Sequence, residues 1–204
     1  KVSGEDLKWF FNQWFLDKGH PELGIEIDYS EPENILVSIT QRQDLTVFPL
    51  YQIPFEISWY VDGEREKKMF FLNKGFQQFA LDNKMPVDQI YFDEEKNLLA
   101  KINIVRDAES YRKQFLTSKI GIARYEALDS LVSMEANEEL KVVINDALSD
   151  SFWAIRESAL RIIQGNTSWL SEDENLENKV FGLVEDDLKN SVRAGAIDAL
   201  ASYD

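Results

Sequence analysis

The sequence of 204 residues contains no cysteine and only one histidine, His20. Without thiols, the chain can form no disulfide bond, no thiolate zinc site and no cysteine nucleophile. A single histidine also excludes any metal site that needs two imidazole ligands from this chain. His20 lies between Gly19 and Pro21 with no carboxylates at ligand spacing, so we interpret it as a turn residue that packs beside Trp9 or Trp14.

Long apolar runs and basic clusters are also missing. No apolar run approaches the roughly 18 residues that a membrane-spanning helix needs. The formal net charge is -15, and acidic residues outnumber basic ones by 18 to 11 in residues 1–105 and by 19 to 11 in residues 106–204. A chain without a basic patch is a poor ligand for nucleic acid or an anionic membrane. We therefore expect neither as a partner.

Proline is absent from the second half of the chain. All five prolines and 17 of the 25 aromatic residues precede residue 105, whereas the remainder is rich in Ala, Leu, Asp and Glu. This is a change from residues that favour strands and turns to residues that favour helices. We therefore expect an α+β chain with a terminal helix in 1–20, a β-rich domain in 21–105 and a helical domain in 106–204.

Hydrophobic and polar residues alternate in the β-rich domain. In ILVSITQ, the side chains of Ile35, Val37 and Ile39 share one face, and FEISWYV repeats this pattern. A period of two is typical of a half-buried strand. We expect six or seven short antiparallel strands that pack as a β-sandwich, at about 24–29, 34–42, 52–61, 66–73, 76–81, 89–92 and 98–104.

Charged segments are interpreted as turns and solvated surface. Asp62-Gly63 stands at a hairpin position, because glycine tolerates a positive φ. Residues 93–97 are expected to form a second hairpin turn. The acidic trios at 93–95 and 185–187 lack the alternating ligands and central glycine of a calcium loop, so we interpret both as solvated. Ser171, followed three residues later by Glu174, predicts a helix start of the capping-box type.

The helical domain contains a longer repeat. The segments ARYEALDSL, AIRESALRI and VRAGAIDAL each have an arginine, then alanine three residues later and an aliphatic residue four residues later. This pattern predicts stacked helix pairs of the HEAT type, an α-solenoid, and an irregular helical bundle is the alternative. We expect the three arginines to form a ladder of bonds to acids or helix-end carbonyls of neighbouring repeats: Arg124, Arg156 and Arg193.

Hydrophobic surface is expected at both ends of the chain. Residues 6–18 predict a helix that ends at the Gly-His-Pro segment, and its broad apolar stripe is suited to a protein surface that precedes Lys1. The last repeat ends at residue 204 without a polar cap, so we expect the helical domain to be truncated. Three residues are expected to pack onto the missing N-terminal body: Trp9, Phe10 and Trp14.

GEDLKWFFNQWFLDKGHPEL resembles the closing helix of the catalytic domain in the aminopeptidase N family of zinc metallopeptidases, the gluzincins. ILVSITQRQ and YQIPFEISWYVDG resemble the strands that follow it in that family. The resemblance implies that the chain is the C-terminal part of a peptidase, with the end of the catalytic domain, a β-sandwich and the start of a HEAT-like domain. It leaves the compartment open, as the bacterial cytoplasm or the periplasm.

The family's catalytic residues do not occur in this sequence. Its chemistry needs an H-E-x-x-H helix with a downstream zinc-binding glutamate, and a Gly-x-Met-Glu-Asn segment for the substrate's amino group. The nearest segment, Met134-Glu135-Ala136, differs at its last position and has Val132 in place of the glycine. We therefore expect no catalytic or metal-binding residue and no cofactor here, with zinc and peptides bound by the parent's missing catalytic domain. A scaffold role in an inactive relative is the alternative function.

Overall fold

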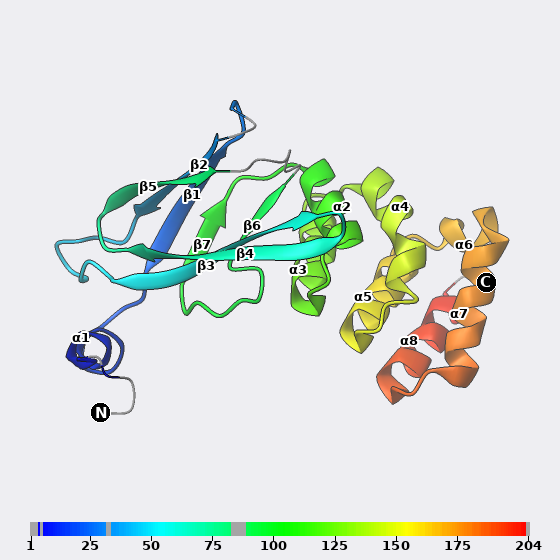
Figure 1. Cartoon of the computed structure of the whole chain (residues 1–204). Helices are drawn as coiled ribbons and strands as arrows, with labels where there is room; N and C mark the ends of the chain where they lie inside the picture. The colour runs from blue at the N-terminus through cyan, green and yellow to red at the C-terminus, as the bar shows by residue number, and fades with distance from the viewer. Residues whose placement is uncertain (1–3, 5, 32–33, 83–88, 203–204) are drawn as a thin grey trace. The chain divides into compact units, whose positions relative to one another are not determined.

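The computed structural model describes residues 4, 6–31, 34–82 and 89–202 and divides the chain into two compact units (Figure 1). Unit 1 comprises residues 1–105 and unit 2 comprises residues 106–204. The division lies within the region where the composition changes. In the described part of the chain, no helix combines the length and apolar character that a bilayer crossing requires.

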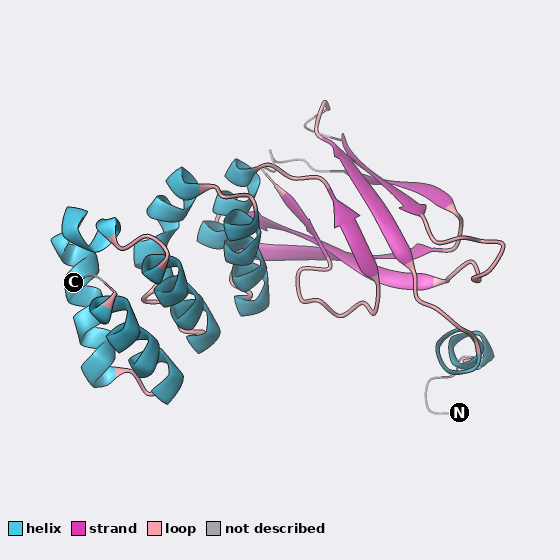
Figure 2. Cartoon of the chain, turned by 180° about the vertical axis from the view of Figure 1, so that it is seen from behind, coloured by secondary structure: helices cyan, strands magenta, loops and turns pink. Residues whose placement is uncertain are grey.

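Unit 1 contains two β-sheets (Figure 2). The strands are ordered β5-β2-β1-β7 in one sheet and β4-β3-β6 in the other. Asp62 and Gly63, with φ angles of 49° and 77°, form the predicted tight turn between β3 and β4. The strand bounds are β1 (Glu22–Asp28), β2 (Asn34–Gln41), β3 (Ile53–Val61), β4 (Glu64–Leu72), β5 (Phe76–Asp82), β6 (Ile90–Phe92) and β7 (Lys101–Ile104).

The two sheets share one hydrophobic core. On β2, Val37 and Ile39 are fully buried, and on β3 Phe55 and Ile57 are buried in the same cluster. Alternate residues of each strand therefore face the same interior, as the period of two predicts. Aromatic rings fill much of the space, since the Phe55 ring lies 5.1 Å from that of Phe79 and 5.0 Å from that of Phe92, measured between centroids.

Two predictions for the end of unit 1 are wrong. β7 pairs with β1 in parallel rather than antiparallel fashion, with Leu23 opposite Ile102. Residues 93–97 do not connect a hairpin, because β6 pairs with β3 in one sheet and β7 belongs to the other. The segment after β6 therefore crosses between the sheets, and Asp93 accepts the backbone N–H groups of Asn97 and Leu98 along the way.

The N-terminal helix is shorter than predicted. A single α-helical turn, α1 (Lys8–Phe11), continues as a π-helical turn, η1 (Asn12–Leu16), whereas the sequence predicts a helix over 6–18. It ends where Asp17 becomes extended. The Gln13 side chain exchanges two hydrogen bonds with the backbone of Gln52, at 3.0 and 2.7 Å, and so attaches this helix to the residue before β3.

Unit 2 consists of helices around a second core (Figure 2). The three repeat alanines, Ala127, Ala159 and Ala196, are fully buried, which lets neighbouring helices approach closely. Asp173, rather than the predicted Ser171, caps α7, because its carboxylate accepts the N–H groups that follow it. The helices are α2 (Ala108–Thr117), α3 (Gly121–Ser133), α4 (Asn137–Ala147), α5 (Trp153–Gln164), α6 (Ser168–Glu172), α7 (Glu174–Asp186) and α8 (Asn190–Ala201).

Gly19 allows a prediction about the connection between η1 and β1. Its φ is +86°, and an added Cβ would lie 2.4 Å from Cδ1 of Phe48. Gly63 also has a positive φ, of +77°, but nothing lies within 4 Å of its added Cβ. Gly63→Ala is therefore expected to cost about 1 kcal/mol, from backbone strain alone. Gly19→Ala is expected to cost about 2 to 4 kcal/mol, because steric overlap adds to the strain.

Urea unfolding of the two variants, followed by tryptophan fluorescence, measures both costs. Equal destabilisation by the two substitutions would contradict the placement of Phe48 against Gly19.

Candidate functional site

The described residues contain no group of three or more His, Asp or Glu side chains placed to hold a metal ion. The His20 side chain is 56% exposed, and its Nε2 lies 4.0 Å from a carboxylate oxygen of Glu22. The polar groups that the fold does bring together form two clusters, one in each unit. The first surrounds Glu94, and the second joins Arg124, Arg156 and Arg193 to neighbouring helices.

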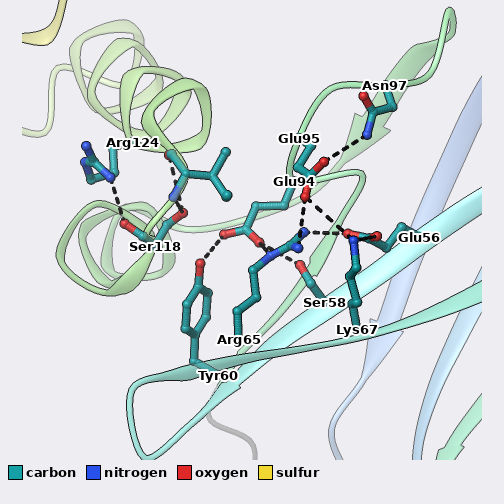
Figure 3. A network of polar contacts seen from close by, with 11 residues as sticks. Glu56, Ser58, Tyr60, Arg65, Lys67, Glu94, Glu95, Asn97, Ser118 and Arg124 are labelled. Atoms are coloured by element: carbon teal, nitrogen blue, oxygen red, sulfur yellow. Dashed lines mark hydrogen bonds and ion pairs between the residues drawn. The ribbon is translucent and has the colours of Figure 1, made fainter. Parts of the chain in front are cut away.

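Glu94 is the centre of a buried network in unit 1 (Figure 3). Its carboxylate is fully buried and accepts three hydrogen bonds at its two oxygens. Ser58 Oγ donates at 2.7 Å, Tyr60 Oη at 2.9 Å and Arg65 Nε at 2.7 Å. The prediction that residues 93–95 are solvated is wrong for Asp93 and Glu94, which are only 3% and 2% exposed.

Arg65 connects Glu94 to the rest of the network. Its guanidinium also contacts Glu56 at 2.5 Å and Glu95 at 2.9 Å, and the Lys67 ammonium lies 2.9 Å from Glu56. Burial alone would lower the pKa of Arg65, but the hydrogen bonds to Glu94 and Glu56 outweigh it and raise the pKa above its usual value. Arg65 therefore stays charged and compensates the charge of Glu94, whose side chain is fully buried.

The pleat of β3 and β4 explains how these side chains meet. Glu56, Ser58 and Tyr60 alternate along β3 on the face opposite the core residues. Tyr60 pairs with Arg65 and Ser58 with Lys67 across the two strands. The alternation in FEISWYV indicates this polar face, but it gives no sign of Glu94, because the charged DEEKN segment has the composition of an exposed turn. One available signal was the position of Arg65 and Lys67 on β4, opposite the polar residues of β3, because two cations there indicate acidic partners.

The repeat arginines form a regular series of contacts in unit 2. Arg124 donates from Nε and Nη2 to the carboxylate of Asp150, at 2.6 and 2.8 Å. Arg156 makes the same pair of bonds to Asp187, at 2.6 and 2.9 Å. Each pair joins a helix to the turn before a later one, because Asp150 precedes α5 and Asp187 precedes α8. The interpretation of residues 185–187 as solvated is therefore wrong for Asp187, which is 8% exposed.

A second set of bonds runs from each arginine to a backbone carbonyl. Arg124, Arg156 and Arg193 donate from Nη1 to the carbonyl oxygens of Ser118, Asp150 and Asp187, at 3.1, 2.7 and 2.5 Å. The two aspartates therefore each accept bonds from two arginines, one at the carboxylate and one at the carbonyl. The hydrogen bonds with Arg156 lower the pKa of Asp187, and the bonds with Asp187 raise that of Arg156.

The aromatic residues of the N-terminal helix differ in how far they are covered by the rest of the chain. Trp14 packs against the core of unit 1, where its ring centroid is 5.6 Å from that of Tyr51, and Trp9 lies 6.1 Å from Phe71. Trp9 and Trp14 therefore both have aromatic partners within this chain, and their packing onto a preceding domain, with Phe10, stays a prediction. Other apolar side chains of the helix are exposed by 37% to 79%: Leu7, Phe10, Phe11, Phe15 and Leu16.

Unit 2 also contains two shallow cavities, of about 190 and 300 Å³. The charged groups at the smaller cavity already interact, since Lys141 Nζ lies 2.9 Å from Glu172. In the larger cavity, Arg161 is bonded to Glu157 at 2.8 Å. Neither lining combines a nucleophile with a base, so the cavities offer no basis for a catalytic assignment.

Comparison with known proteins finds a likeness in fold alone. No known protein family and no curated protein sequence matches the chain. Among solved structures, the chain is similar to aminopeptidase A of Legionella pneumophila, solved in complex with aspartic acid, with a TM-score of 0.69 and 14% sequence identity. The similarity covers 98% of this chain and 29% of that protein, so the chain spans less than a third of its structural relative.

The Glu94 network predicts an asymmetric response to substitution. Arg65→Met leaves the buried Glu94 carboxylate without its cation and is expected to destabilise the protein by about 3 to 5 kcal/mol. Lys67→Met is the control: its side chain is 54% exposed, and the expected loss is below about 1 kcal/mol. Adding Glu94→Gln to Arg65→Met should recover part of the loss, because it removes the unpaired charge.

Guanidinium chloride unfolding of the four proteins measures these differences. An Arg65→Met protein as stable as Lys67→Met would exclude a buried charge at Glu94.

The lowered pKa of Asp187 predicts a pH-dependent contribution to stability. Such a carboxylate stabilises the fold fully above its ordinary pKa of 3.8, and this stabilisation is lost as the pH falls through the lowered value. Asp187→Asn is therefore expected to cost about 2 kcal/mol near pH 7 and progressively less below about pH 3.8. Asp186→Asn is the control, because Asp186 is exposed.

Urea unfolding of both variants at several pH values tests this dependence. A destabilisation by Asp187→Asn that stays constant down to about pH 2 would contradict it.

Proposed function

We propose that the chain is a non-catalytic supporting part of an aminopeptidase-like protein. The observation that carries this proposal is the likeness to Legionella aminopeptidase A, which extends over 98% of the chain but only 29% of the larger protein. In this proposal unit 1 is the family's β-sandwich and unit 2 is the beginning of its HEAT-like helical domain. The zinc, the water that it activates and the peptide substrate belong to a catalytic domain that precedes Lys1.

Three features of the chain suit a bracing role for unit 1. The two sheets share a core dense in aromatic residues, and the Glu94 network fastens the segment after β6 to β3 and β4. Gln13 and Trp14 attach the N-terminal helix to the same unit, while Phe11 and Phe15 are 51% and 70% exposed. An aromatic surface of this kind is suited to contact with another protein domain.

The role proposed for unit 2 is to wall the chamber that the substrate enters. Stacked helix pairs give an extended surface that follows from the rotation between repeats. The Arg124–Asp150 pair joins α3 to the turn before α5, and the Arg156–Asp187 pair joins α5 to the turn before α8, which suits a wall of defined curvature. An assignment of these arginines to substrate binding is less favoured, because their guanidinium groups already bind carboxylates of the chain.

The alternative function is a scaffold in a catalytically inactive relative. Support of an active catalytic domain and support of an inactive one place the same demands on residues 4–202.

The coding sequence upstream of Lys1 and the activity of the full gene product test the proposal together. We expect an H-E-x-x-H motif with a downstream zinc-binding glutamate, and zinc-dependent release of amino acids from aminoacyl anilides by the full product. The 204-residue chain should show neither stoichiometric zinc nor hydrolysis. An upstream domain that lacks these ligands would favour the scaffold. Hydrolysis by the 204-residue chain would contradict both roles.

A further inference from the structure

The contacts of the repeat arginines can be compared position by position. Six residues before each arginine, a turn residue presents its carbonyl oxygen: Ser118 for Arg124, Asp150 for Arg156 and Asp187 for Arg193. Arg124 and Arg156 also bind the carboxylate of the aspartate in the next such turn, with two bonds each. The series therefore has a direction, in which each arginine receives a carboxylate from the repeat that follows.

Arg193 departs from this series at one position. It donates from Nη1 to the Asp187 carbonyl and from Nη2 to the side-chain oxygen of Asn190, at 2.5 and 2.6 Å. Among the residues that the structure describes, no carboxylate takes the place at Arg193 that Asp150 has at Arg124 and Asp187 has at Arg156. Within the described residues, Arg193 of α8 thus makes the bond to a turn carbonyl but not the bond to an aspartate carboxylate.

A hydrophobic side chain on the same helix shows the same departure. Leu128 and Leu160, four residues after Arg124 and Arg156, are both fully buried, whereas Ile197, the equivalent residue after Arg193, is 53% exposed. Leu160 is covered from α8, since a Cβ added to Gly195 would lie 3.5 Å from its Cδ1. In the preceding repeat, the helix that supplies the aspartate turn therefore also covers this aliphatic position.

On the function proposed above, in which unit 2 begins a longer helical array, we propose that the face of α8 that carries Arg193 and Ile197 is a docking surface for a further helix pair of that array, with an aspartate in the turn before its second helix. The aspartate binds Arg193 through both carboxylate oxygens, as Asp187 binds Arg156. The second helix covers Ile197 and has a small residue there, as Gly195 of α8 covers Leu160. The contact at Arg193 and the contact at Ile197 together fix how the second helix aligns along α8, because only one alignment allows both to form.

The occupant is a helix pair of this composition rather than the other end of a second copy. In head-to-tail stacking of two copies, the turn before α3 of one copy would meet α8 of the other. That turn has Ser118, whose side chain carries no negative charge, where the later turns have aspartate. The two aspartates that could serve, Asp150 and Asp187, already bind arginines in their own chain.

A peptide with the sequence of residues 174–201 provides a probe, because it contains both helices of the last pair and the Asp187 turn. It is titrated into the ¹⁵N-labelled 204-residue chain, and the matched control peptide carries Asp187→Asn. The chain variants are Arg193→Met and, as a control on another helix, Arg161→Met. A second measurement joins the same segment to residue 204 through a Gly/Ser linker, which raises its effective concentration to about the millimolar range.

The expected result is saturable binding with shift changes centred on α8. The Asn peptide and Arg193→Met should each weaken binding at least about tenfold, and combining them should weaken it no further, because they remove the same pair. Arg161→Met should leave the affinity unchanged. If Arg193→Met fails to fold, the Asn peptide still tests the contact on the unaltered chain. In the linked form, the appended segment should raise the unfolding midpoint, and its Asn version should raise it less.

Several outcomes would overturn the proposal. The first is equal affinity of the Asp and Asn peptides for the chain. The second is the absence of any effect of the segment, both free and linked. The third is dimerisation of the chain alone that Ile197→Asp abolishes in sedimentation experiments, because the occupant would then be a second copy.

Discussion

Arginines that neutralise buried carboxylates connect the elements of both units. An ionised carboxylate is stable out of water only when a cation and hydrogen-bond donors surround it, and removing one partner costs more than the pair contributes. In unit 1, Arg65 meets this requirement for Glu94, and in unit 2 Arg156 meets it for Asp187. These pairs join segments that are 29 and 31 residues apart in the sequence, so each specifies tertiary structure more than local structure.

The same chemistry has a different geometry in each unit. In the Glu94 network, Ser58, Tyr60 and Arg65 of β3 and β4 all donate to one carboxylate of the segment after β6. The arginine ladder is open, because each guanidinium binds the next aspartate while each aspartate carbonyl receives the following arginine. A convergent network of this kind fastens one segment, whereas a ladder can be extended by further repeats.

Local patterns predicted most of the elements, and contacts between distant segments account for the failures. Alternation placed β2 and β3 to within a residue of their observed bounds, and the Arg-x-x-Ala pattern identified the helices that carry Arg124, Arg156 and Arg193. The burial of Glu94 was missed because its partners lie on other strands and the composition of 93–97 is that of a solvated turn. Trp14 packs against Tyr51, and Gln13 bonds to the backbone of Gln52, which no helical periodicity could indicate.

The parallel pairing of β1 with β7 affects how unit 1 bears a mechanical load. The chain enters β1 at Glu22, opposite Lys101, and leaves β7 at Ile104, opposite Ile25, so the two attachment points lie at opposite ends of the paired strands. A pull on the flanking segments therefore slides one strand along the other and strains all their hydrogen bonds together. An antiparallel pair pulled from adjacent ends would instead open one bond at a time. The pairing of the first and last strands of the unit thus resists such a pull in shear.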